Sequence, residues 1–170
     1  MKLRHFYIFI LTVCTLSCNK STPAGFWKGF DKDDLKINNS DQGPWGGYRA
    51  MYWKRSQGKF SENEIIKYAT DNGWKLADSK TLKSSTVNGW LSNNTPVFPI
   101  DVDGLHISID TNSGGYTNFH RWINGQCNLY KFDSDWVVVN QGTSESKTAF
   151  GYILLSADHT QMSVYHLWGE

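Results

Sequence analysis

The sequence predicts an α+β fold in which one helix packs on a curved antiparallel β-sheet of about seven or eight strands. Three observations support this prediction. Residues 62–72 have an amphipathic pattern with a capping signal at each end. Most of the chain after residue 73 consists of short alternating apolar segments separated by turns. The connections are short, which favours antiparallel neighbours in a single domain over residues 26–170.

The chain before the helix is expected to contain an edge strand, a loop and a second strand. Residues 26–30 are too apolar to stay in water, so they begin the folded unit as an edge strand. Residues 31–47 are polar and rich in turn formers, which predicts a loop anchored by Leu35 and Ile37. In residues 48–54, Tyr48, Ala50 and Tyr52 alternate with Arg49, Met51 and Trp53. Such alternation and the aromatic residues are typical of a strand.

The predicted helix over residues 62–72 is the best-marked element of the chain. Ser61 is a good N-cap, and Glu64 three residues later completes a capping box. Gly73 can adopt the left-handed backbone conformation that commonly ends a helix. The helix is about three turns long, so it needs packing against a sheet for stability. Its apolar stripe consists of Ile65, Ile66, Tyr68 and Ala69.

The rest of the chain alternates between strand candidates and turns. Asn124-Gly125 is a strong hairpin signal between two of these segments. Asp133-Ser134 predicts a tight turn between two more, and residues 157–161 predict the turn of a final hairpin. The strand candidates are residues 74–77, 87–91, 105–110, 116–123, 127–132, 135–140, 150–156 and 162–168.

Charge restricts the classes of partner. The chain has 17 basic and 16 acidic residues, and two of the basic residues, Lys2 and Arg4, lie in the first segment of the chain. Nucleic-acid binding requires a basic excess or stripe, which a near-neutral domain does not provide. We therefore expect no nucleic-acid partner and no electrostatic docking to a membrane.

The first 18 residues have the layout of an export signal. Lys2 and Arg4 are followed by a mostly apolar run of 11 residues from Phe6 to Leu16. A membrane-spanning helix needs about 20 such residues, so this run is too short to span a bilayer. We expect residues 1–17 to be a signal peptide and residues 18–25 a short flexible tether.

The end of this segment, Leu16-Ser17-Cys18, resembles the lipobox of bacterial lipoproteins. The resemblance implies that Cys18 is lipidated and becomes the mature N-terminus. The domain would then be anchored in the cell envelope, on the periplasmic side of the outer membrane in a Gram-negative cell. Thr15 and Ser17 also suit an ordinary signal peptidase, which would give a soluble secreted protein, and an uncleaved anchor is the third possibility.

The three cysteines have different expected roles. Cys14 lies in the signal, and Cys18 is the lipidation candidate. Cys127 shares strand parity with Leu129, so its side chain is expected to face a core. A single cysteine of this kind is a buried small hydrophobic residue or a reactive thiol, and the strand pattern favours burial.

Aromatic residues are the strongest compositional signal, with 8 Trp, 8 Tyr and 9 Phe in the chain. Many are expected to fill the space between helix and sheet. Trp45, Trp53 and Trp90 lie in or beside glycine-rich or polar turns, where complete burial is less expected. Because Trp combines an apolar body with a polar tip, these three residues are the candidates for a binding patch.

The sequence contains no recognisable catalytic or metal-binding pattern. There is no His-Glu-x-x-His motif and no Gly-x-Ser-x-Gly motif. Counted from Asp101 or Asp110, the twelfth position of a calcium loop is Asn112 or Arg121 and not the required Glu. We therefore expect no metal and no cofactor.

Four functional classes remain. We expect a non-enzymatic protein-binding module, of the inhibitor, immunity or assembly-accessory type. The alternative is a glycan or small-ligand binder that uses Trp and Tyr. A hydrolase using His106 or His120 and a purely structural envelope protein are the other two classes. An exposed aromatic patch favours the first class, and a concave trough with aromatic rings facing Asp or Asn favours the second.

Overall fold

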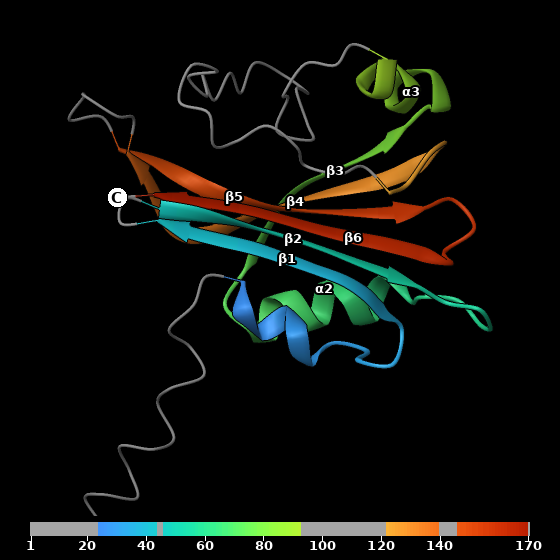
Figure 1. The fold of residues 1–170 in the computed structure, drawn as a ribbon, viewed down its shortest axis with the longest axis horizontal. Coiled ribbons are helices and arrows are strands. Elements are labelled where there is room, and N and C mark those ends of the chain that lie inside the picture. The colour runs from blue at the N-terminus through green and yellow to red at the C-terminus, as the bar shows by residue number, and fades with distance from the viewer. Residues whose placement is uncertain (1–23, 44–45, 93–121, 140–145, 170) are drawn as a thin grey trace, which may run out of the picture.

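The computed structural model describes residues 24–43, 46–92, 122–139 and 146–169. These residues form a single domain built on one six-stranded antiparallel sheet, with two α-helices and a short 3₁₀ helix (Figure 1). Among them, no helix combines the length and apolar character needed to cross a bilayer. The elements are η2 (Gly25–Gly29), β1 (Leu35–Gly43), β2 (Gly46–Lys54), α2 (Glu62–Asp71), β3 (Lys75–Leu82), α3 (Ser84–Ser92), β4 (Cys127–Val139), β5 (Ser146–Ser156) and β6 (Gln161–Gly169).

The α+β class is confirmed, but the described part of the chain has six strands and two α-helices instead of seven or eight strands and one helix. The strand order is β1-β2-β6-β5-β4-β3, so the last hairpin of the chain lies in the middle of the sheet. The α2 helix and η2 cover one face, and α3 lies on the other side (Figure 1). We call these the helix face and the α3 face.

The α2 helix forms as the sequence predicts. The backbone N–H of Glu64 donates to Ser61 Oγ at 3.4 Å, which satisfies one of the free donors of the first turn. Gly73 has a positive φ of 94°, the conformation that ends helices. Ile65 and Ala69 are buried and hold the helix against the sheet.

Two apolar cores cover the two faces of the sheet. The helix-face core contains Trp27, Trp53 and Trp74, so the prediction that aromatic residues fill the space between helix and sheet is confirmed for these three. The α3-face core contains Cys127 and Leu129, which confirms the predicted burial of Cys127. Each core mixes residues from distant strands, and alternation along each strand decides which core a residue joins.

The first segments of the domain differ from prediction. Residues 26–30 were expected to form an edge strand, but they belong to the 3₁₀ helix η2 and its C-cap. Residues 31–47 were expected to form a loop, but most of them form β1. The β1 strand is an edge strand with largely exposed side chains, so no apolar alternation marks it in the sequence.

Leu35 and Ile37 do act as the anchors of this segment, but on opposite faces of the sheet. Leu35 packs against the helix-face core and Ile37 against the α3-face core. A register shift between them in the pairing with β2 accounts for this, because residues two apart normally share one face.

Residues 87–91 were predicted to be a strand, and this prediction is wrong because they lie in α3. The carbonyl of Lys83 accepts from the N–H groups of Thr86 and Val87 at 3.0 and 3.2 Å and starts the helix. Val87 is 1% exposed and joins the α3-face core. The segment contains few apolar residues, so its periodic signal was too weak to separate a helix from a short strand.

The prediction of two strands separated by a turn at Asp133-Ser134 is also wrong. The β4 strand is continuous across these residues, with a register shift between Asp133 and Val137 in its pairing with β5. Asp135 has a positive φ of 57° at this irregularity. The turn-forming residues therefore mark a bulge within a strand.

The hairpin predicted around Asn124-Gly125 does not form. The strand at Cys127–Asp133 pairs with β3 on one side and β5 on the other, which leaves no edge for residues 116–123. Trp122 and Ile123 are not in a strand, and the rest of that segment lies outside the described residues. The predicted strand at residues 105–110 also lies outside them.

Candidate functional site

The three tryptophans predicted to form a binding patch do not meet on the described surface. Trp53 is 0% exposed in the helix-face core, and its indole N–H donates to the Phe30 carbonyl at 2.9 Å. It therefore cannot belong to a surface patch. Trp45 lies outside the described residues, and for Trp90 only the backbone, in α3, is described. Among the large hydrophobic side chains that the structure describes, Leu76 is the one that is exposed.

Several other sequence candidates lie outside the described residues. These are Cys18, His106, His120 and the two Asp-rich segments tested as calcium loops. Within the described part of the chain, no group of three or more His, Cys, Asp or Glu side chains could hold a metal ion. Cys127 is buried and unpaired, and burial raises the pKa of its thiol to about 11.

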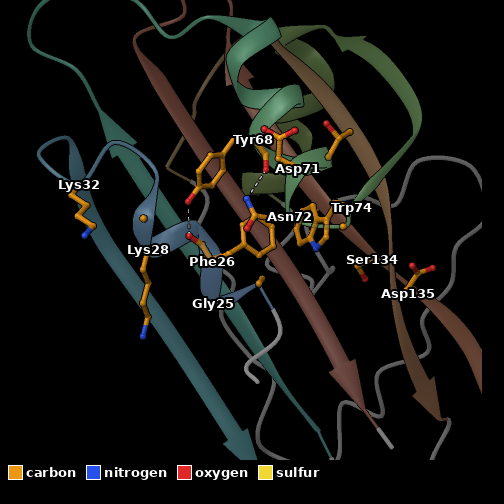
Figure 2. A pocket seen from close by; sticks show the side chains of 14 residues that line it. Gly25, Phe26, Lys28, Lys32, Tyr68, Asp71, Asn72, Trp74, Ser134 and Asp135 are labelled. Atoms are coloured by element: carbon orange, nitrogen blue, oxygen red, sulfur yellow. Dashed lines mark hydrogen bonds between the residues drawn. The ribbon is translucent and has the colours of Figure 1, made fainter. Parts of the chain in front are cut away.

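A pocket of about 860 Å³ lies on the helix face, beside the C-terminal end of α2. Its walls come from three segments that are far apart in the sequence: residues 24–32, residues 68–74, and the β4 bulge at Ser134 and Asp135 (Figure 2). Pockets of about 300–1,000 Å³ suit small ligands. The lining includes aromatic, amide, carboxylate and ammonium groups.

Aromatic contacts hold the two main walls together. The Tyr68 hydroxyl donates to the Phe26 carbonyl at 2.8 Å, and the Asn72 side-chain amide donates to the Tyr68 carbonyl at 2.9 Å (Figure 2). The rings of Phe26 and Trp74 meet edge to face, with centroids 5.5 Å apart. These contacts fix η2 against the end of α2 and give the pocket a rigid aromatic wall.

The rim of the pocket carries unequal charge. Asp71 and Asp135 are already paired with Lys67 and Lys75, at 2.6 and 3.2 Å. Lys28 and Lys32 extend from the side opposite Ser134 and Asp135 (Figure 2). Among the described residues these two lysines make no ion pair. The uncompensated charge at the rim is therefore positive.

The inner wall of the pocket connects to a buried histidine. Ser134, which is 5% exposed, lines the pocket, and its Oγ lies 2.8 Å from Nε2 of His166. The Trp74 ring, also in the lining, lies 5.5 Å from the imidazole. His166 is 0% exposed, and burial, followed by the charge of Arg49, lowers its pKa to about 3. The imidazole is therefore neutral at pH 7.

Arg49 lies beside His166 and is itself buried. The two residues are directly opposite each other in the pairing of β2 with β6. Arg49 is 4% exposed, and its Nε and Nη1 atoms make no hydrogen bond within the described structure. Burial lowers the pKa of the guanidinium from its ordinary value. Buried guanidinium nitrogens without an acceptor are rare because removing them from water costs free energy that no hydrogen bond offsets.

The Ser134–His166 pair can be compared with the acid–base machinery of a hydrolase. The Ser134–His166 pair resembles part of a hydrolytic triad, but no carboxylate contacts Nδ1 of His166 among the described residues. An imidazole with a pKa of about 3 is a weak general base at neutral pH. Within the described ranges, the pair therefore lacks the carboxylate that orients the imidazole in a hydrolytic triad.

His166 lies in the strand predicted over residues 162–168, which forms as β6, but the sequence analysis did not connect it to a site. The signal that could have found the cluster is the parity of Arg49. It alternates with Tyr48 and shares a face with Met51 and Trp53, so an arginine stands on the apolar side of a strand.

No protein-family model, no curated protein and no solved structure matches this chain.

Proposed function

We propose that this chain is an envelope lipoprotein that acts by binding a small polar ligand or glycan in the helix-face pocket. The anchor part of the proposal rests on Met1–Cys18 and the lipobox-like Leu16-Ser17-Cys18. Lipid on Cys18 would hold the domain at the membrane, because two or more acyl chains anchor stably. Between Cys18 and Ala24 the tether spans at most about 20 Å. The pocket lining begins at Ala24, so the ligand site would lie close to the bilayer.

The observation that carries the binding proposal is the concave pocket itself. The aromatic residues Phe26, Tyr68 and Trp74 line it together with polar groups that include Asn72 and Asp71 (Figure 2). Aromatic faces and hydrogen-bonding side chains at one concave surface are the features that recognise sugars and similar polar ligands. The buried, poorly basic His166 behind Ser134 is the reason for proposing binding without catalysis.

The test is calorimetric titration of the full chain, purified in uncharged detergent, with a panel of neutral and acidic oligosaccharides of the cell envelope. We expect saturable binding that Lys28→Asp on the pocket rim weakens. Lys36→Asp is the matched control, because Lys36 is exposed on β1 and does not line the pocket. Equal loss in both variants, or no binding of any panel member, would contradict the ligand pocket.

A protein partner is the second candidate, and the open edge of the sheet favours it. In the described structure β1 pairs with β2 on one side only, so its outer backbone groups are free to pair with a strand of another chain. The test is a photo-crosslinking residue at Ser40 in β1. We expect one identified envelope protein to crosslink there and not at Ser79 in β3, the opposite edge strand.

A further inference from the structure

The two edge strands of the sheet, β1 and β3, differ in how open they are to another strand. In β3 the backbone N–H of Ser79 already donates to Oδ1 of Asp78 at 2.7 Å. Asp78 and Lys80 also place charges in this strand, and charged residues protect an edge from pairing. In β1, residues 37–43 pair with β2 without a register shift and carry one charge, that of Asp41. The β1 edge is therefore the one suited to strand pairing.

Backbone hydrogen bonds determine which β1 residues face the open side. At the C-terminal end of β2, the N–H of Lys54 donates to the Asp34 carbonyl before β1, at 3.0 Å. The next N–H, of Arg55, donates to the Thr160 carbonyl before β6, at 2.9 Å. Because this direction alternates along a strand, even-numbered β2 residues bond to β1 and odd-numbered ones to β6. The β1 residues opposite odd-numbered β2 residues therefore direct their N–H and C=O groups outward. They are Asn38, Ser40 and Gln42.

These outward backbone groups are accessible. Residues 38–43 are all exposed, so the edge is open along this stretch. Among the described residues, no hydrogen bond runs to the outward groups of Asn38, Ser40 or Gln42. Three such residues can make about six backbone hydrogen bonds with an antiparallel strand.

The sequence of β1 is complementary to itself in one antiparallel register. When Ser40 lies opposite Ser40 of a second copy, Asn38 lies opposite the second copy's Gln42, and Asn39 opposite its Asp41. Polar side chains then face polar side chains, and no like charges meet. Moving the centre one residue towards the C-terminus places the two Asp41 carboxylates opposite each other, which is destabilising. Moving it one residue the other way places this carboxylate opposite an apolar side chain.

This register also keeps the helix faces of both copies on one side. Residues directly opposite each other in an antiparallel pair point to the same face, so the two-fold axis is perpendicular to the joined sheet. The chain enters the described domain at Ala24, which is buried in the helix-face core. Both copies therefore receive their tethers from the same side, and two copies anchored through Cys18 can pair on one membrane.

We propose that the strand that pairs with β1 is the β1 strand of a second copy of this chain, which joins two six-stranded sheets into one. This names the partner in the second candidate function and rests on the proposed lipid anchor. One strand pair is a small contact, whereas stable interfaces bury about 1,200–2,000 Å². Anchoring both copies in one bilayer raises their effective concentration, which favours a weak pairing.

The first experiment measures disulfide formation between copies of the full chain in lipid vesicles. Ser40→Cys places two thiols opposite each other with their Cα atoms about 5.5 Å apart, which is within the range of a disulfide. Ser79→Cys is the matched control, because Ser79 is an exposed serine on β3, the other edge strand. We expect Ser40→Cys to form a covalent dimer at least tenfold faster than Ser79→Cys. Equal rates would indicate random collisions and overturn the proposal.

The second experiment measures energy transfer between two labelled populations of the chain in the same vesicles. The N–H of Ser40 faces outward, so Ser40→Pro removes no bond between β1 and β2 but blocks pairing with a second copy. We expect an unchanged urea midpoint and at least tenfold less dimer. Asn39→Pro is the control, because the Asn39 N–H faces Ala50 of β2 and its loss should lower the midpoint. A dimer that persists in Ser40→Pro would overturn the proposal.

Ser40→Lys tests the same contact without a change to the backbone. It places two ammonium groups opposite each other at the two-fold axis, so energy transfer should again fall at least tenfold. Ser79→Lys should leave the transfer unchanged, and equal loss in both variants would contradict pairing through β1. Photo-crosslinking from Ser40 to a different envelope protein, with no homodimer, would also overturn the second copy as partner. That result would leave the β1 edge as a protein-binding site, and the ligand titrations test the pocket independently.

Discussion

His166 and Ser134 make a hydrogen bond of 2.8 Å although a whole strand separates them. His166 is on β6 and Ser134 on β4, and β5 runs between them. The position opposite His166 on β5 is Gly151. Because glycine has no side chain, the Trp74 ring lies directly on the β5 backbone beside the imidazole. The inner wall of the pocket therefore depends on one glycine in the centre of the sheet.

Gly151→Ala should destabilise the domain by overpacking. A Cβ at this position would lie 2.1 Å from the nearest atom of the Trp74 ring, so the ring would have to move. We expect a loss of about 1–3 kcal/mol in the free energy of unfolding, measured with urea. Trp74→Phe removes the distal ring atoms, so the two substitutions together should cost less than the sum of their separate effects. Simple additivity would contradict the proposed contact.

Stability should fall on acidification because of His166. Its pKa in the folded state is about 3, against an ordinary value of 6.5. Between these values the unfolded chain binds a proton that the folded chain does not, so the folded state loses stability as pH falls. The expected slope approaches about 1.4 kcal/mol per pH unit in this window.

His166→Gln is the variant that isolates this contribution. Its free energy of unfolding should depend less on pH between 6.5 and 3 than that of the unchanged chain. Asp158, whose pKa is lowered to about 2 by hydrogen bonds from Ser156 and Thr160, acts in the same direction but at lower pH. Identical slopes in the two chains above pH 4 would rule out His166 as the cause.

The accuracy of the sequence predictions depended on how strongly each element is marked locally. The α2 helix has a cap, an apolar stripe and a glycine stop, and it forms where expected. The β1 and α3 elements carry few apolar residues, so their patterns were too weak to identify. In β4, Asp133-Ser134 has local turn chemistry, but pairing with a neighbour on each side keeps the strand continuous.

The candidate site was harder to predict than the fold because it joins distant segments. Cys127 was placed correctly since parity along one strand determines its burial. Trp53 was misassigned because proximity to polar residues in sequence does not report which face of a strand is covered. Arg49, Ser134 and His166 come from three strands, and only the strand order brings them together.

The N-cap of α2 offers a local test of the fold. Ser61→Ala removes the acceptor for the Glu64 N–H and should lower the free energy of unfolding by about 0.5–1 kcal/mol. Ser61→Asp keeps an acceptor and adds a negative charge at the helix N-terminus, so it should retain full stability. Urea denaturation of the three chains measures both effects. Equal loss in the two variants would mean that the side chain stabilises the domain in another way.

Thiol counting tests the burial of Cys127 and the proposed lipid anchor together. In the native chain Cys127 is 0% exposed with a pKa of about 11, so about one thiol in a thousand is ionised at pH 8 and access is blocked. We expect no reaction of the native protein with Ellman's reagent over minutes, and complete reaction of Cys127 in urea.

If the signal is removed and Cys18 is lipidated, the unfolded mature chain should contain one reactive thiol. Cys127→Ala is the matched control and should contain none. A second thiol would show that Cys18 is free, and rapid reaction of the native chain would contradict the burial of Cys127.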